Sequence, residues 1–257
     1  MWVEGMHQDL RLIHFALPGG KIGFMESRIA RPNAIKLFFT FIYILIFPAL
    51  ILILAGDWLW IEGCIFNIWF IALCTTVIIY LYIRDPALLM ERYKQPGAAN
   101  QKGWDKYVVI GLVLGFTLWI VIMPLDARRF IWSVGFPVWA KVMGGIFLLL
   151  SSYLFYRSYR DNTFVSGLVR IQTERKQTVV TTGAYGFVRH PMYLGGILLF
   201  FGAPLLMGSL YGLLISFLLT LLIAGRIIGE EKMLVKGLQG YAEYRKKVKY
   251  RLLPFIW

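Results

Sequence analysis

Long apolar runs constrain this chain more than any other feature of its sequence. A helix needs about 20 mostly apolar residues to cross the hydrocarbon core of a bilayer. Runs close to that length cover residues 36–55, 63–83, 107–123 and 138–156. A fifth run, residues 193–228, has Arg226 as its single charge and is too long for one span, but Gly202, Pro204 and Gly208 offer a break. We predict an all-α, polytopic membrane bundle of about six helices, the last two in a tight hairpin with a short first helix.

Composition excludes other classes of protein. The chain is 58% hydrophobic and 16% charged, whereas soluble domains are about half apolar and about a quarter charged. Disordered chains are poor in apolar residues, so disorder is excluded as well. Cys64 and Cys74 are the only cysteines and share one apolar run, so we expect neither a disulfide framework nor a metal site.

The net charge of +13 would suggest nucleic acid as the partner of a soluble protein. Here 24 of the 27 Lys and Arg residues fall in alternate segments between the predicted spans, all on one side of the membrane: residues 1–36, 84–106, 157–190 and 226–257. Segments rich in Lys and Arg stay in the cytoplasm. We therefore expect the bilayer and not nucleic acid as partner, with both termini cytoplasmic (in a bacterium, a multi-pass protein of the inner membrane).

The chain divides into three regions. Residues 1–35 form a cytoplasmic or interfacial segment, residues 36–156 a region of four membrane helices, and residues 157–257 a C-terminal region that includes the hairpin 193–228. In the first region, large apolar residues recur at helical spacing, which fits either an interfacial helix or a disordered start: Trp2, Met6, Leu10, Ile13 and Leu17.

A motif at the start of the hairpin suggests chemistry. A β-branched run and a glycine turn lead into Arg189-His190-Pro191, which opens a membrane helix. Proline suits the first helical turn, and free N–H groups there, with Arg189 and His190, favour an anion. Basic residues at the cytoplasmic end of a membrane helix are also what the topology alone would give. His190, however, is the only histidine outside the N-terminal segment.

A second motif follows the hairpin. Glu230 and Glu231 are adjacent carboxylates at a helix end, where the positive-inside bias and the helix dipole both disfavour them. They are either a solvated helix face or groups with a cationic partner or ligand. The hairpin brings His190 and Glu230 to one side of the membrane, since paired helices lie about 8–10 Å apart. We predict a site there, with the bilayer on one side and the cytosol on the other.

The tail is expected to continue as an amphipathic helix. One stripe holds Leu234, Leu238, Tyr241, Tyr244 and Val248. This stripe packs either on the domain or on the membrane. The basic cluster beside it suits anionic headgroups or an anionic group of a substrate: Lys246, Lys247, Lys249 and Arg251.

Taken in order, these motifs resemble the isoprenylcysteine carboxyl methyltransferase family and its bacterial, archaeal and phospholipid methyltransferase-like relatives. The resemblance covers about residues 160–257. It rests on Asn162-x-Phe164, Gly183-x-Tyr185, Arg189-His-Pro-x-Tyr193, Glu230-Glu-x-x-Leu234, Tyr241-x-x-Tyr244 and Leu253-Pro254.

The resemblance implies an integral membrane methyltransferase that uses S-adenosylmethionine, held on the cytoplasmic side, and acts on a lipid-like or prenylated acceptor. The cofactor-binding residues that it implies are Val180, Gly183, Tyr185, His190, Tyr193, Glu230 and Glu231. Its candidate catalytic residues are Arg189, Glu230 and Lys247. Lys247-Val248 stands where the family has Arg-Val, and lysine lacks the planar fork of arginine. Both carboxyl O-methylation and N- or O-methylation of a lipid therefore stay open.

Two other functions remain open. Membrane sterol and enone reductases that use NADPH carry a similar Arg-His-Pro-x-Tyr element, although their tails differ from Glu-Glu-x-x-Leu, and a non-catalytic membrane protein is the third possibility. For an enzyme, we expect a lipid-like acceptor to enter laterally beside Gly195, Gly196 and Gly202, unless these glycines serve only close helix packing.

Overall fold

Six apolar helices form the membrane part of the molecule. The computed structural model describes residues 12–16, 22–26, 32–98 and 100–257. Within them, five helices are long and apolar enough to cross a membrane: α1 (Ala34–Ala55), α2 (Ile61–Arg84), α4 (Gly103–Pro124), α5 (Val138–Asp161) and α7 (Leu210–Gly237). The sixth, α6 (Pro191–Met207), is shorter. The predicted helical membrane bundle, with a short first helix in its last hairpin, is confirmed.

The hairpin turns at Gly208 and Ser209. Gly208 has a φ of 83°, a left-handed conformation that glycine adopts readily, and the Ser209 side chain caps α7 by accepting a hydrogen bond from the Gly212 N–H. The Ser209 hydroxyl also donates to the fully buried Asp126, at 2.6 Å. Asp126 lies in η1 (Leu125–Arg129), a π-helical turn that continues α4. One buried carboxylate therefore anchors the turn.

Helices α5 and α6 pack most closely. A methyl group on Gly144 of α5 would lie 2.3 Å from the backbone nitrogen of Leu206, and one on Gly202 of α6 would lie 3.0 Å from the Gly144 oxygen. A methyl group on Gly195 would lie 3.3 Å from Cβ of Leu154. Gly195 and Gly202 therefore bring two backbones together.

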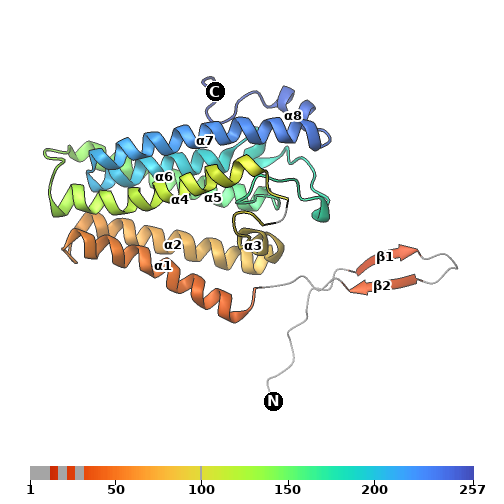
Figure 1. Cartoon of the computed structure of the whole chain (residues 1–257), viewed down its shortest axis with the longest axis horizontal. Helices are drawn as coiled ribbons and strands as arrows, with labels where there is room; N and C mark the ends of the chain where they lie inside the picture. The colour runs from red at the N-terminus through yellow and green to blue at the C-terminus, as the bar shows by residue number, and fades with distance from the viewer. Residues whose placement is uncertain (1–11, 17–21, 27–31, 99) are drawn as a thin grey trace, which may run out of the picture.

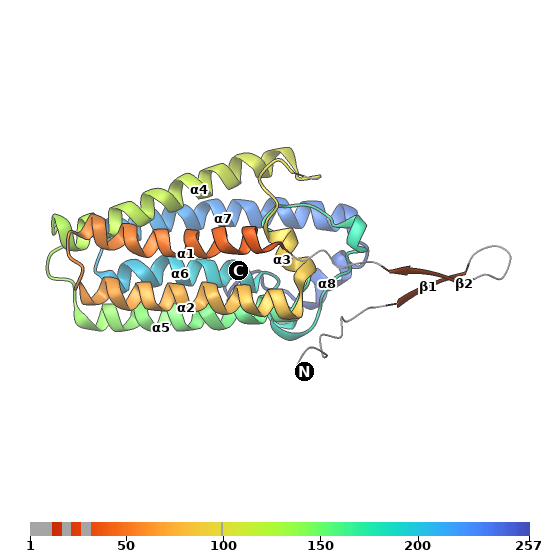
Figure 2. The same cartoon turned by 90° about the horizontal axis from the view of Figure 1, so that it is seen from below.

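The main apolar core lies between the long helices, which run side by side in Figures 1 and 2. Trp119 of α4 is fully buried at its centre, and its indole N–H donates to the Ser216 hydroxyl on α7, at 2.9 Å. The outward faces of the same helices are rich in exposed large apolar side chains. That distribution suits a bundle whose solvent is lipid.

One end of the bundle carries most of the irregular structure. Helices α3 (Pro86–Arg92) and α8 (Tyr241–Lys247) lie at this end, with the segment 162–190 (Figures 1 and 2). That segment contains two short 3-10 helices, η2 (Thr173–Arg175) and η3 (Gly183–Gly186). We call it the site end.

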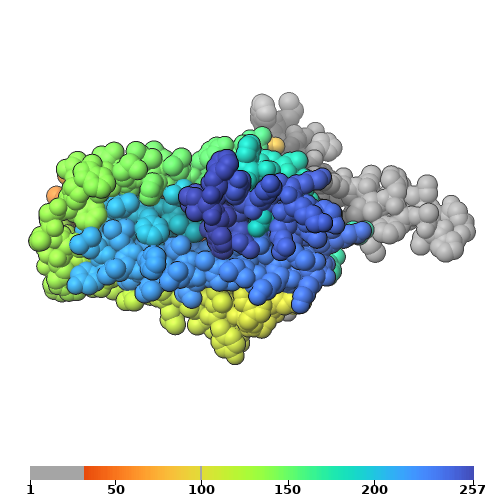
Figure 3. All heavy atoms as spheres, turned by 90° about the horizontal axis from the view of Figure 1, so that it is seen from above, coloured from red at the N-terminus to blue at the C-terminus, as the bar shows by residue number. Residues whose placement is uncertain are grey.

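The tail differs from the single amphipathic helix that was predicted. Helix α7 continues to Gly237, the chain breaks at Gly240, whose φ is 84°, and α8 then begins. The predicted stripe still faces one way, because all its members are buried together against Val169 and Met233: Leu234, Leu238, Tyr241, Tyr244 and Val248. Within the described residues, the stripe thus packs on the protein. The last residues of the chain lie over α6 and α7 (Figure 3).

Two strands precede the helices. β1 (Leu12–Ala16) and β2 (Ile22–Glu26) pair antiparallel, with Leu12 opposite Glu26. The predicted interfacial helix is therefore wrong at Ile13, because strand pairing replaces helical hydrogen bonding there. Its other apolar positions lie outside the described residues: Trp2, Met6, Leu10 and Leu17.

Candidate active site

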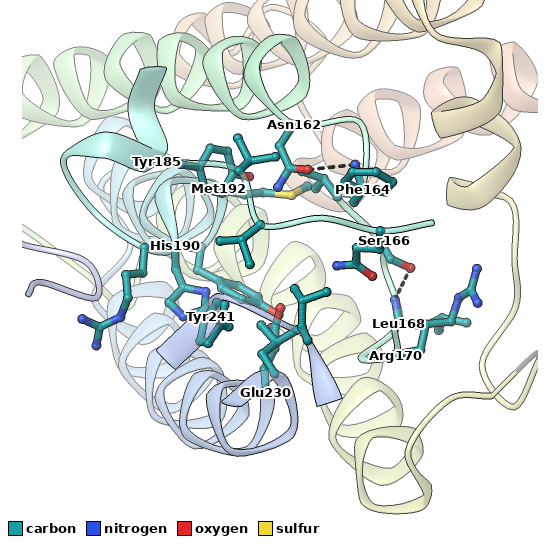
Figure 4. Close-up of a pocket in the computed structure, with 18 of the residues that line it drawn as sticks. Asn162, Phe164, Ser166, Leu168, Arg170, Tyr185, His190, Met192, Glu230 and Tyr241 are labelled. Carbon is teal, nitrogen blue, oxygen red and sulfur yellow. Dashed lines mark hydrogen bonds between the residues drawn. The ribbon is translucent and has the colours of Figure 1, made fainter. Parts of the chain in front are cut away.

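A cavity of about 330 Å³ lies at the site end, walled by the segment 162–190, the start of α6, the end of α7 and α8 (Figure 4). Most of the predicted site residues line it: Val180, Tyr185, Arg189, His190, Tyr193 and Glu230. Gly183, Glu231 and Lys247 do not. The predicted convergence of the two ends of the hairpin is therefore present in the geometry.

Glu230 is the acidic group of the cavity lining. Its carboxylate accepts a hydrogen bond of 2.7 Å from the Tyr193 hydroxyl, which joins the first turn of α6 to α7. Among the described residues, no cation lies within ion-pair distance of Glu230. This half-buried carboxylate is thus free to receive a positively charged ligand group.

Glu231 points the other way and is the centre of a buried ion cluster. Its side chain is 2% exposed and accepts from Arg189 Nε at 2.6 Å and Arg251 Nε at 3.0 Å, while His190 Nε2 lies 3.2 Å away. A buried carboxylate with such partners is expected to be structural. Glu231 therefore holds the two cavity-lining residues Arg189 and His190 in place.

The same two residues bind the backbone of residues 248–251, which we call the C-terminal strap. Arg189 Nη1 donates to the carbonyl oxygens of Val248 and Lys249, at 2.6 and 2.7 Å. The backbone N–H groups of Arg189 and His190 donate to the carbonyls of Tyr250 and Arg251. The strap thus holds two cavity-lining residues in place, although none of its own residues lines the cavity.

Gly183 shapes the turn that carries Tyr185. Its φ is 60°, and a methyl group there would lie 2.1 Å from the Asp161 carboxylate, which accepts a hydrogen bond from the Ala184 N–H. Only glycine allows this approach. Tyr185 is buried, and its carbonyl accepts from the Tyr244 hydroxyl at 2.7 Å. Lys247, in contrast, is exposed at the end of α8 and does not line the cavity.

Sequence reasoning missed two ion pairs that hold the cavity wall. Arg170 binds Glu91 of α3 through two hydrogen bonds, at 2.8 and 2.7 Å. Arg226 binds the fully buried Asp105 of α4, at 2.7 Å, and also the carbonyl of Gly167. Both arginines line the cavity. No local signal reveals these pairs, since their members are 79 and 121 residues apart.

Tyr241 adds a polar atom whose role as a ligand contact was not predicted. Its hydroxyl is buried, lacks a hydrogen-bond partner among the described residues, and belongs to a side chain on the cavity (Figure 4). Burial raises the pKa of Tyr241, so the hydroxyl stays protonated. Buried polar atoms are normally paired. This hydroxyl is therefore available to a bound molecule.

Comparison with known proteins bears on the same region. Residues 139–240 match the family model of the phospholipid methyltransferases. This region is therefore similar to the phospholipid methyltransferases. All residues that line the cavity lie within the matched region except Arg92, Tyr241 and Tyr244. The predicted family resemblance is confirmed for this part of the chain.

Three curated relatives share part of the chain. Two are protein-S-isoprenylcysteine O-methyltransferases. The one from Schizosaccharomyces pombe is 34% identical over 110 residues, 40% of this chain and 44% of the relative. The one from Saccharomyces cerevisiae is 33% identical over 136 residues, which are 51% of this chain and 55% of the relative. A Delta(14)-sterol reductase from Mus musculus is 30% identical over 105 residues, which are 40% of this chain and 25% of the relative. The matches thus span between a quarter and about half of each relative.

Proposed function

We propose that this protein is a membrane methyltransferase that uses S-adenosylmethionine to methylate a lipid-like or prenylated acceptor. The observation that carries the proposal is that the region matching the phospholipid methyltransferase family model supplies nearly the whole cavity lining. The cavity joins polar loops to apolar membrane helices, which suits a charged donor and a greasy acceptor. Its volume of about 330 Å³ lies within the range of small-molecule sites.

The residues fit such a donor. Glu230 and Tyr193 offer a carboxylate without a cation, which suits the positive charges of the donor. The unpartnered hydroxyl of Tyr241 offers a further hydrogen bond. Val180 and Tyr185 supply an apolar and aromatic wall. When bound, the donor supplies a methyl group that its sulfonium charge has already activated.

Catalysis then depends on positioning and on the exclusion of water. Arg189 and His190 are held by Glu231 and by the C-terminal strap. The opposite wall is held by the pair of Arg170 and Glu91. Glu231 and Gly183 thereby act as positioning residues for the cavity, although they do not line it.

We further propose that the acceptor approaches through a groove between α2 and α5. This groove of about 360 Å³ is lined mostly by apolar and aromatic side chains, including Trp69, Val77, Tyr156 and Tyr159. The Arg92 guanidinium lies over the Tyr159 ring, 5.7 Å from its centroid, and Arg92 also lines the cavity. The groove therefore reaches the cavity wall, whereas the close contacts of Gly195 and Gly202 favour their packing role.

A reductase that uses NADPH is the competing function, and the sterol reductase relative is the observation in its favour. The phosphates of NADPH need unpaired cations. In the cavity, Arg170, Arg189 and Arg226 are each paired with a carboxylate, which leaves Arg92 as the one lining arginine without such a partner among the described residues, and Glu230 adds a negative charge. One free cation beside an unpaired carboxylate suits a donor that carries both charges better than the several phosphates of NADPH. The electrostatics therefore favour the methyl donor.

Ligand binding by the detergent-purified protein tests the proposal. We expect S-adenosylhomocysteine, the product form of the donor, to raise the melting temperature and NADPH to leave it unchanged. Transfer of a labelled methyl group from the donor into a native lipid extract should follow. Stabilisation by NADPH alone would replace the proposed function by the reductase.

A further inference from the structure

The cavity is lined by four arginines, and three of them are already paired. Arg170 binds Glu91, Arg189 binds Glu231, and Arg226 binds Asp105. The guanidinium of the fourth, Arg92, has no carboxylate within ion-pair distance and no hydrogen bond to any described residue. Among the arginines of the described lining, Arg92 is therefore the one whose guanidinium lacks an acceptor.

Packing holds the Arg92 side chain against the cavity wall. Its guanidinium lies over the Tyr159 ring, and a methyl group on Gly167 would lie 3.7 Å from its Nη1. A guanidinium has five N–H donors, and those of Arg92 have no acceptor among the described residues. Arg92 therefore combines a fixed position with unused donors.

The neighbouring carboxylate does not satisfy Arg92. Glu91 precedes it in the chain, but its two oxygens accept from Arg170, Lys94 and Ser166. A half-buried guanidinium without an acceptor is unfavourable unless its head reaches water or a ligand. Since Arg92 lines the cavity, a bound molecule is the acceptor that the site itself offers.

We propose that Arg92 binds an oxyanion of the ligand in this cavity, through the bidentate geometry that guanidinium forms with carboxylate or phosphate. The inference rests on the proposed function and adds the chemistry of the ligand. Glu230 and Arg92 then give the cavity one unpaired anion and one unpaired cation. The oxyanion comes either from the amino-acid end of the donor or from an acceptor that arrives through the groove past Tyr159.

The test compares Arg92→Gln with wild type and with Arg84→Gln, which removes an exposed arginine at the end of α2 that does not line the cavity. Calorimetry measures affinity for S-adenosylhomocysteine and for methylthioadenosine, which lacks the carboxylate. Methyl transfer measures the KM for farnesylcysteine and for phosphatidylethanolamine. Arg92→Lys keeps the positive charge but lacks the planar fork of the guanidinium, so its affinity or KM should lie between those of wild type and Arg92→Gln.

We expect Arg92→Gln to weaken binding by roughly 10- to 150-fold, the range for one charged hydrogen bond. If the donor supplies the oxyanion, affinity for S-adenosylhomocysteine falls and that for methylthioadenosine does not. If the acceptor supplies it, both affinities stay and the KM rises. Either result supports the inference, provided that Arg84→Gln behaves as wild type.

Unchanged affinities together with an unchanged KM would overturn the inference and leave the proposed function standing. Equal losses for both nucleosides together with a lower melting temperature would also overturn it, because they would assign Arg92 a packing role. If the wild-type protein binds neither nucleoside, the proposed function fails and the inference fails with it.

Discussion

The Tyr193 hydroxyl lies 2.7 Å from the Glu230 carboxylate and joins the first turn of α6 to α7 across 37 residues of sequence. Successive residues on a helix point about 100° apart. Glu231 is consequently turned away from the cavity and into the ion cluster with Arg189, His190 and Arg251. Two identical adjacent side chains thus have different surroundings, and they should respond differently to substitution.

Glu230→Gln should weaken binding of S-adenosylhomocysteine by roughly 10- to 150-fold, because one charged contact is lost, while the melting temperature stays near that of wild type. Glu231→Gln should instead destabilise the fold by about 3–5 kcal/mol, since buried cations lose their carboxylate. Calorimetry and thermal unfolding separate the two effects. Equal loss of stability in both variants would contradict the division of roles.

The ion pair between Glu91 and Arg170 should make the stability of the folded protein depend on pH. Burial acts to raise the pKa of Glu91, but hydrogen bonds from Arg170, Lys94 and Ser166 outweigh it and hold the pKa below its usual value. A carboxyl group whose pKa is lower in the folded protein than in the unfolded chain stabilises the fold. That stabilisation is complete above the pKa of the unfolded chain, about 4.3. It is lost as the pH falls through the pKa of the folded protein. The difference in melting temperature between wild type and Glu91→Gln should shrink on acidification from pH 7 to pH 3. A constant difference would refute the pair's contribution.

Two adjacent glycines of α5 provide a matched test of helix packing. Gly144→Ala places a methyl group 2.3 Å from the backbone of α6 and should destabilise the protein by about 1–3 kcal/mol. Gly145→Ala meets nothing within 4 Å and should be neutral or stabilising by up to about 1 kcal/mol, because alanine favours helix. Thermal unfolding in one detergent compares the two. Similar melting temperatures would show that α5 and α6 tolerate separation.

The charge distribution predicts that the site end faces the cytoplasm. In a background without Cys64 and Cys74, a cysteine replacing the exposed Thr182 at this end should resist a membrane-impermeant maleimide in intact cells. A cysteine replacing the exposed Val134, in the loop before α5, should react. Permeabilised cells serve as the control for reactivity. The reverse pattern would invert the predicted topology.

Local sequence patterns predicted the helices and the hairpin because bilayer thickness translates directly into run length. They also brought His190 and Glu230 to one place, since a hairpin returns to the side from which it starts. They did not separate Glu230 from Glu231, because the direction of each side chain depends on the phase of α7. The break at Gly240 was missed as well, since the apolar stripe continues across it.

The ion pairs that hold the cavity wall could not be predicted from local sequence patterns. Arg226 appeared only as a lone charge in an apolar run, yet it binds Asp105 at the start of α4. Arg170 appeared as one of many basic loop residues, yet it binds Glu91 of α3. Each partner is set by how distant helices pack, and a buried ion pair between them leaves no spacing signal in the sequence.

The C-terminal strap has a consequence for the order of events during synthesis. The backbone N–H groups of Arg189 and His190, and Nη1 of Arg189, take their carbonyl acceptors from residues 248–251. At translation rates of about 5–20 residues per second, roughly 3–12 s separate the synthesis of the two segments. Throughout that interval the nascent chain contains the Arg-His pair without its carbonyl acceptors. The two cavity-lining residues therefore gain these backbone supports only when translation of this region ends, after the last membrane helix has been made.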